Sequence, residues 1–226
     1  MKIAFISDVH SNYYALKSVL ENIKKEKANE IYLAGDIIGY HSMPNEVIEL
    51  IKENNIISIK GNHDYDIINK RFDENIKDFK IWTYENLTEE NKKYIINLPE
   101  ELIIEKNNIR IKIVHGSSRD IAEYLFENSK QIEKEAENLK EDVLICAHTH
   151  FPYIKKIHNK IIVNTGSVGK PKIAKPTPNY IILNTENKEF EIKFVEYEVE
   201  KMCKDMKNKG LSEKHIKELR LGKVIK

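Results

Sequence analysis

The first sixty residues alternate between short apolar runs and amphipathic segments. The runs KIAFIS, EIYLA and IISIK have the length and the apolar content of buried strands. Apolar residues then recur at helical spacing behind Ser11, which can cap a helix, and residues 44–53 show the same spacing. This order of strand, helix, strand, helix and strand predicts a parallel sheet with right-handed crossovers.

The pattern changes in the rest of the chain. Asp78 to Leu98 and Arg119 to Lys140 are expected to be helical, whereas most other segments are short alternating runs. ELIIE and IRIKIV flank Asn107-Asn108, YIKKI and IIVN flank His158-Asn159, and NYIILN and FEIKFVEYEV flank TENK, so these pairs read as antiparallel hairpins. VLICA is a further strand. The expected fold class is therefore α/β, with two mixed β-sheets packed as a sandwich and helices on the outer faces.

The chain has the size of one domain. It holds 226 residues, and no linker rich in proline, glycine or serine divides it. We expect one domain over residues 1–200 and a short helical C-terminal extension, residues 201–226, packed on it. Charges nearly balance, with 37 basic and 36 acidic residues, so the composition gives no strong nucleic-acid signal.

Cysteine usage and the apolar runs indicate the compartment. Cys146 and Cys203 lie far apart and outside any C-x-x-C motif, which fits a reducing compartment. The N-terminal run meets Asp8 too early for a signal peptide, and no apolar run approaches the ~18 residues of a transmembrane helix. The sequence predicts a soluble cytoplasmic protein without a membrane partner, and leaves a homo-oligomer open.

Side chains able to bind metals directly follow five of the expected strands. They are Asp8 and His10, Asp36, Asn62 to Asp64, His115, and His148 with His150. Ligands bind beyond the carboxyl ends of strands in open α/β sheets. Residues two apart in a strand point to the same side, so Asp8 with His10, and His148 with His150, can converge. The other histidines are expected in loops or at the surface: His41, His158 and His215.

The number and chemistry of these side chains indicate two metal ions. Seven qualify as ligands: Asp8, His10, Asp36, Asn62, His115, His148 and His150. That is too many for one tetrahedral zinc, whereas two ions that share a bridging carboxylate fit the number. Imidazole, carboxylate and amide oxygen suit Mn²⁺, Fe, Zn²⁺ or Co²⁺, so the donor set leaves the metal open.

In this order, the motifs D-x-H, G-D, G-N-H-D, H-G and H-x-H resemble those of the calcineurin-like metallophosphoesterase superfamily. The stretches SDVHSNYYAL, GDIIGY, GNHD, VHGS, AHTHFP and NTGSVGKP look most like its compact YfcE-like phosphodiesterase branch, over about Met1 to Leu183. The resemblance implies the metallophosphoesterase fold and two divalent metal ions. Manganese is favoured, with iron, zinc, nickel or cobalt as alternatives.

The same resemblance implies a role for each residue. Asp8, His10, Asp36 and His150 would hold the first metal, and Asp36, Asn62, His115 and His148 the second. Asp36 would bridge the two ions together with water or hydroxide. His63 would face the phosphate and stabilise its charge or protonate the leaving oxygen. Asp64 would either orient the ring of His63 or cap the turn that follows.

Three further residues are candidates for contact with the substrate. Asn12 could bind the phosphate or cap the first helix. Gly166, in the glycine-rich stretch NTGSVGK, could present backbone N–H groups near the site or belong to a plain loop. Lys170 is the third, although relatives often carry Gln there and Arg at Lys172. Ala147 stands where relatives usually have glycine, which removes no ligand.

The resemblance implies a metal-dependent phosphoric ester hydrolase, most simply a phosphodiesterase in which a metal-bridging hydroxide attacks phosphorus in line. A protein or monoester phosphatase and a dinucleoside-polyphosphate hydrolase share the fold and differ in pocket walls. A non-catalytic interaction scaffold is a further alternative, because the retromer scaffold subunit has this fold without an intact ligand set. The expected partner is a phosphate-ester substrate. The motifs determine neither its identity, nor the native metal, nor the role of the C-terminal extension.

Overall fold

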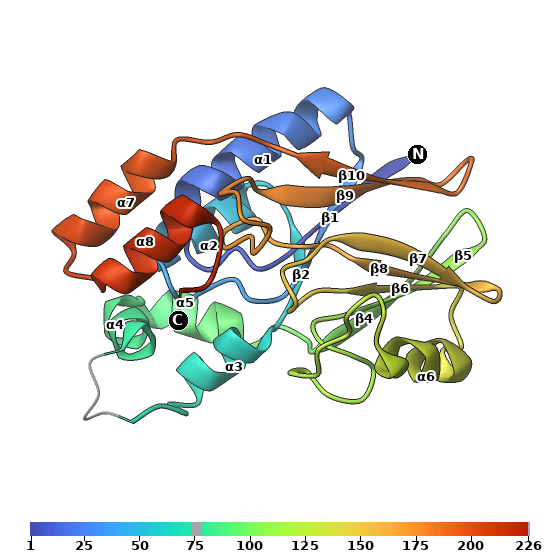
Figure 1. Cartoon of the computed structure of the whole chain (residues 1–226), viewed down its shortest axis with the longest axis horizontal. Coiled ribbons are helices and arrows are strands. Elements are labelled where there is room, and N and C mark those ends of the chain that lie inside the picture. The colour runs from blue at the N-terminus through green and yellow to red at the C-terminus, as the bar shows by residue number, and fades with distance from the viewer. Residues whose placement is uncertain (74–77, 226) are drawn as a thin grey trace.

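Two β-sheets form the centre of the molecule (Figure 1). The computed structural model describes residues 1–73 and 78–225. The first sheet has the order β10-β9-β1-β2-β3 and consists of β1 (Lys2–Ile6), β2 (Glu30–Ala34), β3 (Ile57–Ile59), β9 (Asn179–Asn184) and β10 (Glu189–Phe194). β1, β2 and β3 are parallel, and β9 runs antiparallel to both β1 and β10.

The second sheet has the order β4-β5-β6-β8-β7. Its strands are β4 (Glu101–Lys106), β5 (Ile109–Val114), β6 (Val143–Cys146), β7 (Tyr153–Ile157) and β8 (Lys160–Asn164). β5, β6 and β8 are parallel, whereas β4 and β7 are antiparallel to their neighbours at the two edges. Both residues of the Asn107-Asn108 turn have positive φ, at 48° and 57°, as a tight hairpin requires.

The first strand shows how the layers stack. Ile3 and Phe5 of β1 belong to an apolar cluster shared with β5 and β6 of the second sheet. Ala4 and Ile6 point the other way and belong to the cluster that contains the first two helices. A strand covered on both faces reads as a continuous apolar run, which is the pattern of KIAFIS. The expected α/β sandwich of two mixed sheets is confirmed.

Helices cover the outer faces. α1 (Tyr13–Glu26) and α2 (Pro44–Glu53) pack on the first sheet, and α6 (Lys130–Asn138) packs on the second. α3 (Asn62–Ile68), α4 (Phe79–Asn86) and α5 (Glu89–Ile96) follow β3, while α7 (Val199–Asn208) and α8 (Glu213–Leu221) form a pair beside α1 (Figure 1). None of the helices in the described part of the chain is long and apolar enough to cross a membrane.

Several expected helix boundaries are wrong. The segment expected as one helix over 119–140 is helical only from Lys130 to Asn138. Before it, the Oγ of Ser117 accepts hydrogen bonds from the N–H groups of Arg119 and Asp120, so a polar side chain offers the backbone partners outside a helix. The segment over 78–98 divides into α4 and α5, because Thr88 caps a new helix start.

Other differences concern element ends. Asn12, and not Ser11, caps α1 by accepting a hydrogen bond from Ala15 N at 3.1 Å. α3 lies directly after the third strand, where no helix is expected, and the last strand ends at Phe194. Within the expected extension, α7 begins slightly earlier than residue 201, and Lys226 lies outside the described residues.

Candidate metal centre

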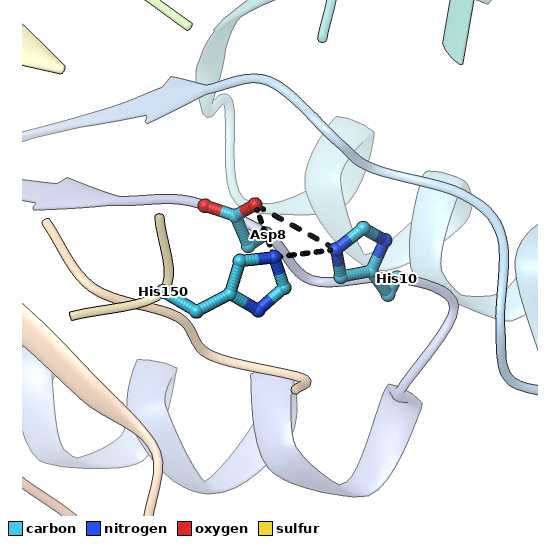
Figure 2. Close-up of side chains that lie close together, drawn as sticks. All are labelled: Asp8, His10 and His150. Atoms are coloured by element: carbon cyan, nitrogen blue, oxygen red, sulfur yellow. Dashed lines mark hydrogen bonds and ion pairs between the residues drawn. The ribbon is translucent and has the colours of Figure 1, made fainter. Parts of the chain in front are cut away.

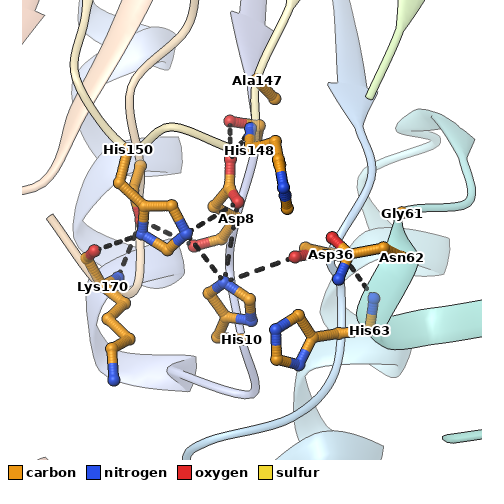
Figure 3. A network of polar contacts seen from close by, with 12 residues as sticks. Asp8, His10, Asp36, Gly61, Asn62, His63, Ala147, His148, His150 and Lys170 are labelled. Atoms are coloured by element: carbon orange, nitrogen blue, oxygen red, sulfur yellow. Dashed lines mark hydrogen bonds and ion pairs between the residues drawn. The ribbon is translucent and has the colours of Figure 1, made fainter. Parts of the chain in front are cut away.

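The seven expected ligands lie together at one end of the two sheets, and Figure 3 shows most of them. Asp8 and His10 follow β1, Asp36 follows β2, Asn62 begins α3 after β3, His115 follows β5, and His148 and His150 follow β6. Because the carboxyl ends of parallel strands from both sheets meet here, residues 140 positions apart in sequence come into contact. All but Asn62 are buried.

Five of these ligands have a left-handed backbone, with φ of 50° at Asp8, 48° at His10, 55° at Asp36, 65° at His148 and 63° at His150. The expectation that residues two apart converge because they share a strand face is wrong, since β1 ends at Ile6 and β6 at Cys146. The side chains converge through left-handed turns instead. Asp and His enter this region more readily than most residues, and such strain collects at functional sites.

The first group of ligands consists of Asp8, His10 and His150 (Figure 2). Asp8 Oδ1 lies 3.1 Å from His150 Nε2 and 3.6 Å from His10 Nε2, and the two nitrogens are 3.4 Å apart. The Nδ1 atoms face backbone carbonyls, that of Lys170 at 2.5 Å and that of Ile38 at 3.4 Å. A carbonyl only accepts, so each Nδ1 carries the proton and each Nε2 of a neutral ring turns a lone pair to Asp8.

The second group consists of Asp36, Asn62, His115 and His148. His115 Nε2 lies 3.4 Å from Asp36 Oδ2 and 3.0 Å from Asn62 Oδ1, while its Nδ1 faces the carbonyl of Ala34 at 2.8 Å. Asp36 Oδ2 is also 3.6 Å from His10 Nε2. This oxygen therefore lies between the two groups, where a carboxylate shared by two ions would be.

Each of the two central carboxylates has one oxygen held by the protein and one left over. Asp36 Oδ1 accepts from the backbone N–H of His63 at 2.8 Å, and Asp8 Oδ2 accepts from Ser7 Oγ at 2.6 Å. Asp8 Oδ1, Asp36 Oδ2 and His148 Nε2 are buried and lack a hydrogen-bond partner among the described residues. Buried lone pairs that face one another are costly unless a cation binds them. The residues present thus fit two divalent cations.

Electrostatics differ among the ligands. Burial alone would raise the pKa of Asp8, but the nearby His150 holds it well below its usual value. Burial disfavours a charged imidazole at His115, yet the Asp36 carboxylate outweighs this and raises the pKa of His115 to about 9. Burial lowers the pKa of both His148 and His150 to about 4. Near neutral pH, His115 therefore carries a proton that a metal ion would have to displace.

Two glycines are required by the close approach of strand ends. A Cβ on Gly61 would lie 2.1 Å from Asp36 Oδ1, and one on Gly35, whose φ is +85°, would lie 2.7 Å from the Cα of Gly61. A side chain at Gly61 would displace Asp36, and one at Gly35 would displace Gly61 and His115. This contact explains in physical terms why the G-D and G-N-H-D motifs contain glycine.

His63 and Asp64 have separate environments. The ring of His63 lies edge-on to His10 with centroids 4.9 Å apart, and its buried Nδ1 has no hydrogen-bond partner among the described residues. His63 also forms a third candidate metal group with His10 and Asp36. The carboxylate of Asp64 accepts from the backbone N–H groups of Ile37, Ile38 and Gly61. Of the two roles considered for Asp64, these contacts match the cap.

The three substrate candidates have their polar groups engaged elsewhere. Asn12 caps α1 and donates to the carbonyl of Gly169 at 3.0 Å. The carbonyl of Gly166 accepts from Ser7 Oγ, and the N–H of Gly166 donates to Asn164 Oδ1. The ammonium of Lys170 forms an ion pair with Glu218 at 2.8 Å, and its side chain runs away from Asp8 in Figure 3. None of the three directs a free polar group at the ligand cluster.

Two expectations about neighbouring residues can be settled. His41 lies in a loop, as expected, but it is buried there, since it is 1% exposed and its Nδ1 faces the carbonyl of His10 at 2.6 Å. Ala147 is tolerated in the turn because the positive φ falls on His148 and His150, and not on Ala147. Its N–H donates to the carbonyl of His115 at 2.8 Å, which links the two strand ends.

Aromatic rings around the ligands were missed by the motif analysis. Tyr40 lies 4.7 Å from His63 and stacks on Phe79 at 4.3 Å between centroids. On another flank, Tyr124 lies 4.1 Å from the ring of His148 and stacks on Phe126 at 5.5 Å. Tyr124 and Phe126 are 47% and 45% exposed. Only Tyr40, which ends the GDIIGY stretch, stands in a motif that could have drawn attention to it.

The chain is similar to known proteins over most of its length. Residues 1–188 match the calcineurin-like phosphoesterase superfamily domain. An uncharacterized protein of Methanocaldococcus jannaschii is 34% identical over 222 residues, covering 88% of this chain and 89% of that protein. Phosphodiesterase YfcE of Escherichia coli is 25% identical over 191 residues, covering 78% and 84%. The crystal structure of a metallophosphoesterase from Sphaerobacter thermophilus has a TM-score of 0.88 at 28% identity, covering 98% of this chain and 99% of that one.

Proposed function

Because this chain belongs to the calcineurin-like phosphoesterase superfamily, we propose that it is a phosphodiesterase that works with two divalent metal ions. The observation that carries the proposal is the set of buried ligand atoms without partners: Asp8 Oδ1, Asp36 Oδ2 and His148 Nε2. Two cations bound there would polarise a water molecule for attack and neutralise the charge of the phosphoryl oxygens. Manganese suits the mixture of imidazole, carboxylate and amide donors.

Asp36 is the residue that would join the two ion sites. The backbone N–H of His63 holds its Oδ1 at 2.8 Å, so Oδ2 alone remains to face His10 at 3.6 Å and His115 at 3.4 Å. A fixed carboxylate needs no reorganisation when ions or substrate bind. We assign Asp8, His10, Asp36 and His150 to one ion and Asp36, Asn62, His115 and His148 to the other.

His63 is the residue that we assign to the chemistry itself. Its ring lies beside His10 with an unpartnered Nδ1, and aromatic rings of Tyr40 and Phe79 pack around it. Such a ring can donate a hydrogen bond to a phosphoryl oxygen, or pass a proton to the leaving oxygen. Asp64 would support it indirectly, by capping α3 at the turn that carries Asn62 and His63.

The exposed rings beside the ligands favour an organic ester over a bare phosphate. Tyr124 and Phe126 stack on each other and are 47% and 45% exposed, and the ring of Tyr124 lies 4.1 Å from that of His148. Planar groups bind such faces with a gain of about 0.5–1.5 kcal/mol per ring pair. A diester with at least one planar substituent is therefore the substrate class that we propose.

A metal-by-substrate panel tests the proposal. The metal-free protein is assayed with Mn²⁺, Ni²⁺, Co²⁺ or Zn²⁺ against bis-p-nitrophenyl phosphate, p-nitrophenyl phosphate, cyclic nucleotides, dinucleoside polyphosphates and phosphopeptides. We expect metal-dependent turnover, with the diester preferred over the monoester. Turnover of the monoester or of phosphopeptides alone would show that the protein is a phosphatase and not a phosphodiesterase. If neither turnover nor bound metal is found, the non-catalytic scaffold is the interpretation that remains.

A further inference from the structure

The C-terminal helix α8 reaches the metal centre although it lies beyond the part of the chain that defines the family. The family match ends at residue 188, whereas α8 spans Glu213–Leu221. Glu218 of this helix forms an ion pair with Lys170, with Oε2 and Nζ 2.8 Å apart. Glu218 is 4% exposed and Lys170 7%, so solvent screens the pair little.

Lys170 connects this ion pair to a ligand. Its carbonyl oxygen accepts the hydrogen bond from His150 Nδ1 at 2.5 Å (Figure 3). That bond determines which nitrogen of the ring carries the proton, and it turns Nε2 to within 3.1 Å of Asp8 Oδ1. Glu218 therefore binds the side chain of Lys170, and the backbone carbonyl of Lys170 orients His150.

Further contacts hold α8 against the same segment. Glu218 Oε1 accepts from the backbone N–H of Ile225 at 3.2 Å, which keeps the carboxylate directed inward. The carbonyl of Gly222, at the end of α8, accepts from the N–H of Ala174 at 2.9 Å. The segment from Lys170 to Ala174 is therefore tied to α8 at two points.

We propose that Glu218 is a positioning residue for the first metal site, acting through Lys170 on the orientation of His150. The inference rests on the metal centre of the proposed function. Burying two charges gains little stability compared with an apolar pair of similar size, so the ion pair is better explained by the geometry that it imposes. In this role the C-terminal helices complete the metal site, in addition to covering the domain.

Direct Mn²⁺ binding to the full-length, metal-free protein tests this role. Glu218→Leu should weaken one of the two bound ions about 10–100-fold, the range found when contacts that support a ligand are lost. The second ion should bind as in the wild type. Glu218→Gln, which keeps one acceptor for Lys170, should lie between the two proteins.

Glu200→Leu is the matched control. Glu200 forms a two-bond ion pair with Arg220, at 2.8 and 2.7 Å, that also joins α7 to α8 but is largely exposed and does not involve Lys170. This variant should bind both ions normally. If Glu218→Leu also binds both ions with wild-type affinity, Glu218 has no positioning role. If Glu200→Leu weakens the same ion equally, the effect belongs to helix docking in general, and the proposal is again overturned.

Two further variants keep the test decisive. In a His150→Ala background, Glu218→Leu should not weaken the first ion any further, because the residue it positions is gone. An undiminished effect there would overturn the proposal. If Glu218→Leu unfolds, Lys170→Met/Glu218→Leu removes both charges and leaves no lone buried ion. That protein should fold and still bind the first ion weakly, whereas wild-type affinity would contradict the inference. A wild-type protein that binds no metal would instead refute the metal centre itself, and this inference with it.

Discussion

The two ligand groups of the candidate metal centre are supported differently. In the group of Asp8, His10 and His150, both imidazoles direct Nδ1 at backbone carbonyls, those of Ile38 and Lys170. In the group of Asp36, Asn62, His115 and His148, only His115 directs its Nδ1 at a backbone carbonyl. Among the described residues, no hydrogen bond reaches the ring of His148, whose neighbour is the half-exposed Tyr124.

The first ligand group therefore resembles a preorganised site, whereas the second contains a histidine, His148, whose ring can adjust. In our proposal, strand ends and α8 would fix the first group before any ion binds. In the second group, His148 would take its final position from the ion that it binds, and its ring faces the open aromatic side of the centre. We expect the first ion to be held more firmly and the second to lie nearer the substrate.

Asp36→Asn should have the largest effect, because Asp36 lies between the two ligand groups. Its single free oxygen lies within 3.6 Å of ligand nitrogens from each group. Turnover should fall to the background rate, and metal analysis should find both ions depleted. Asp142→Asn is the control, because this carboxylate is exposed and precedes β6, whereas the ligand His148 follows that strand. Loss of one ion alone would show that Asp36 does not bridge.

His63→Ala should have the next largest effect, and His63 belongs to neither ligand group in our assignment. Loss of a group that stabilises or protonates the transition state costs about 10²–10⁴ in kcat. Metal content, measured in parallel, should stay near that of the wild type. A depleted ion would instead assign His63 to the third candidate group, with His10 and Asp36.

His150→Ala and His148→Ala compare the two ligand groups directly. Each loss should exceed the roughly 10–100-fold cost of losing a contact that supports a ligand. Loss of His150 should be the more costly of the two, because a backbone carbonyl holds its Nδ1. Mn²⁺ titration of both variants provides the measurement. Equal losses of Mn²⁺ affinity in the two variants would mean that the hydrogen bonds to backbone carbonyls do not contribute to metal affinity.

The pH dependence of metal binding should show the smallest difference. Asp36 raises the pKa of His115 to about 9 against the effect of burial, so an ion entering the second site must displace a proton. Affinity there should rise about tenfold per pH unit up to about pH 9 and then level off. Burial lowers the pKa of His150 to about 4, so this residue adds no such dependence to the first site.

Calorimetry in buffers of different ionisation enthalpy counts the protons released. We expect the stronger release with the second ion. The raised pKa of His115 also makes the stability of the metal-free protein depend on pH. The contribution of His115 to the stability of the metal-free protein should be complete below the ordinary histidine pKa of about 6.5 and be lost as pH rises through about 9. Equal proton release by the two ions would contradict the different states of His115 and His150.

The sequence by itself determined the layered α/β fold and the residues that gather at the strand ends. A continuous apolar run such as KIAFIS indicates a strand that is buried on both faces. The carboxyl ends of parallel strands lie at the same edge of a sheet, and this does not depend on the conformation of the loops. These are local and topological rules, so Asp8, Asp36 and His148 could be chosen without coordinates. The same rules gave the wrong reason for their convergence, because period-two alternation does not describe left-handed turns.

Only the tertiary structure decided how these residues are supported. The free oxygens of Asp8 and Asp36, the burial of His41 and the ion pair between Lys170 and Glu218 all depend on distant segments. Lys170 and Glu218 are 48 positions apart and follow no common motif. Local periodicity records which face of an element is buried, but not which side chain of another element it meets. Packing makes that choice, because it alone sets the distances at which hydrogen bonds and ion pairs form.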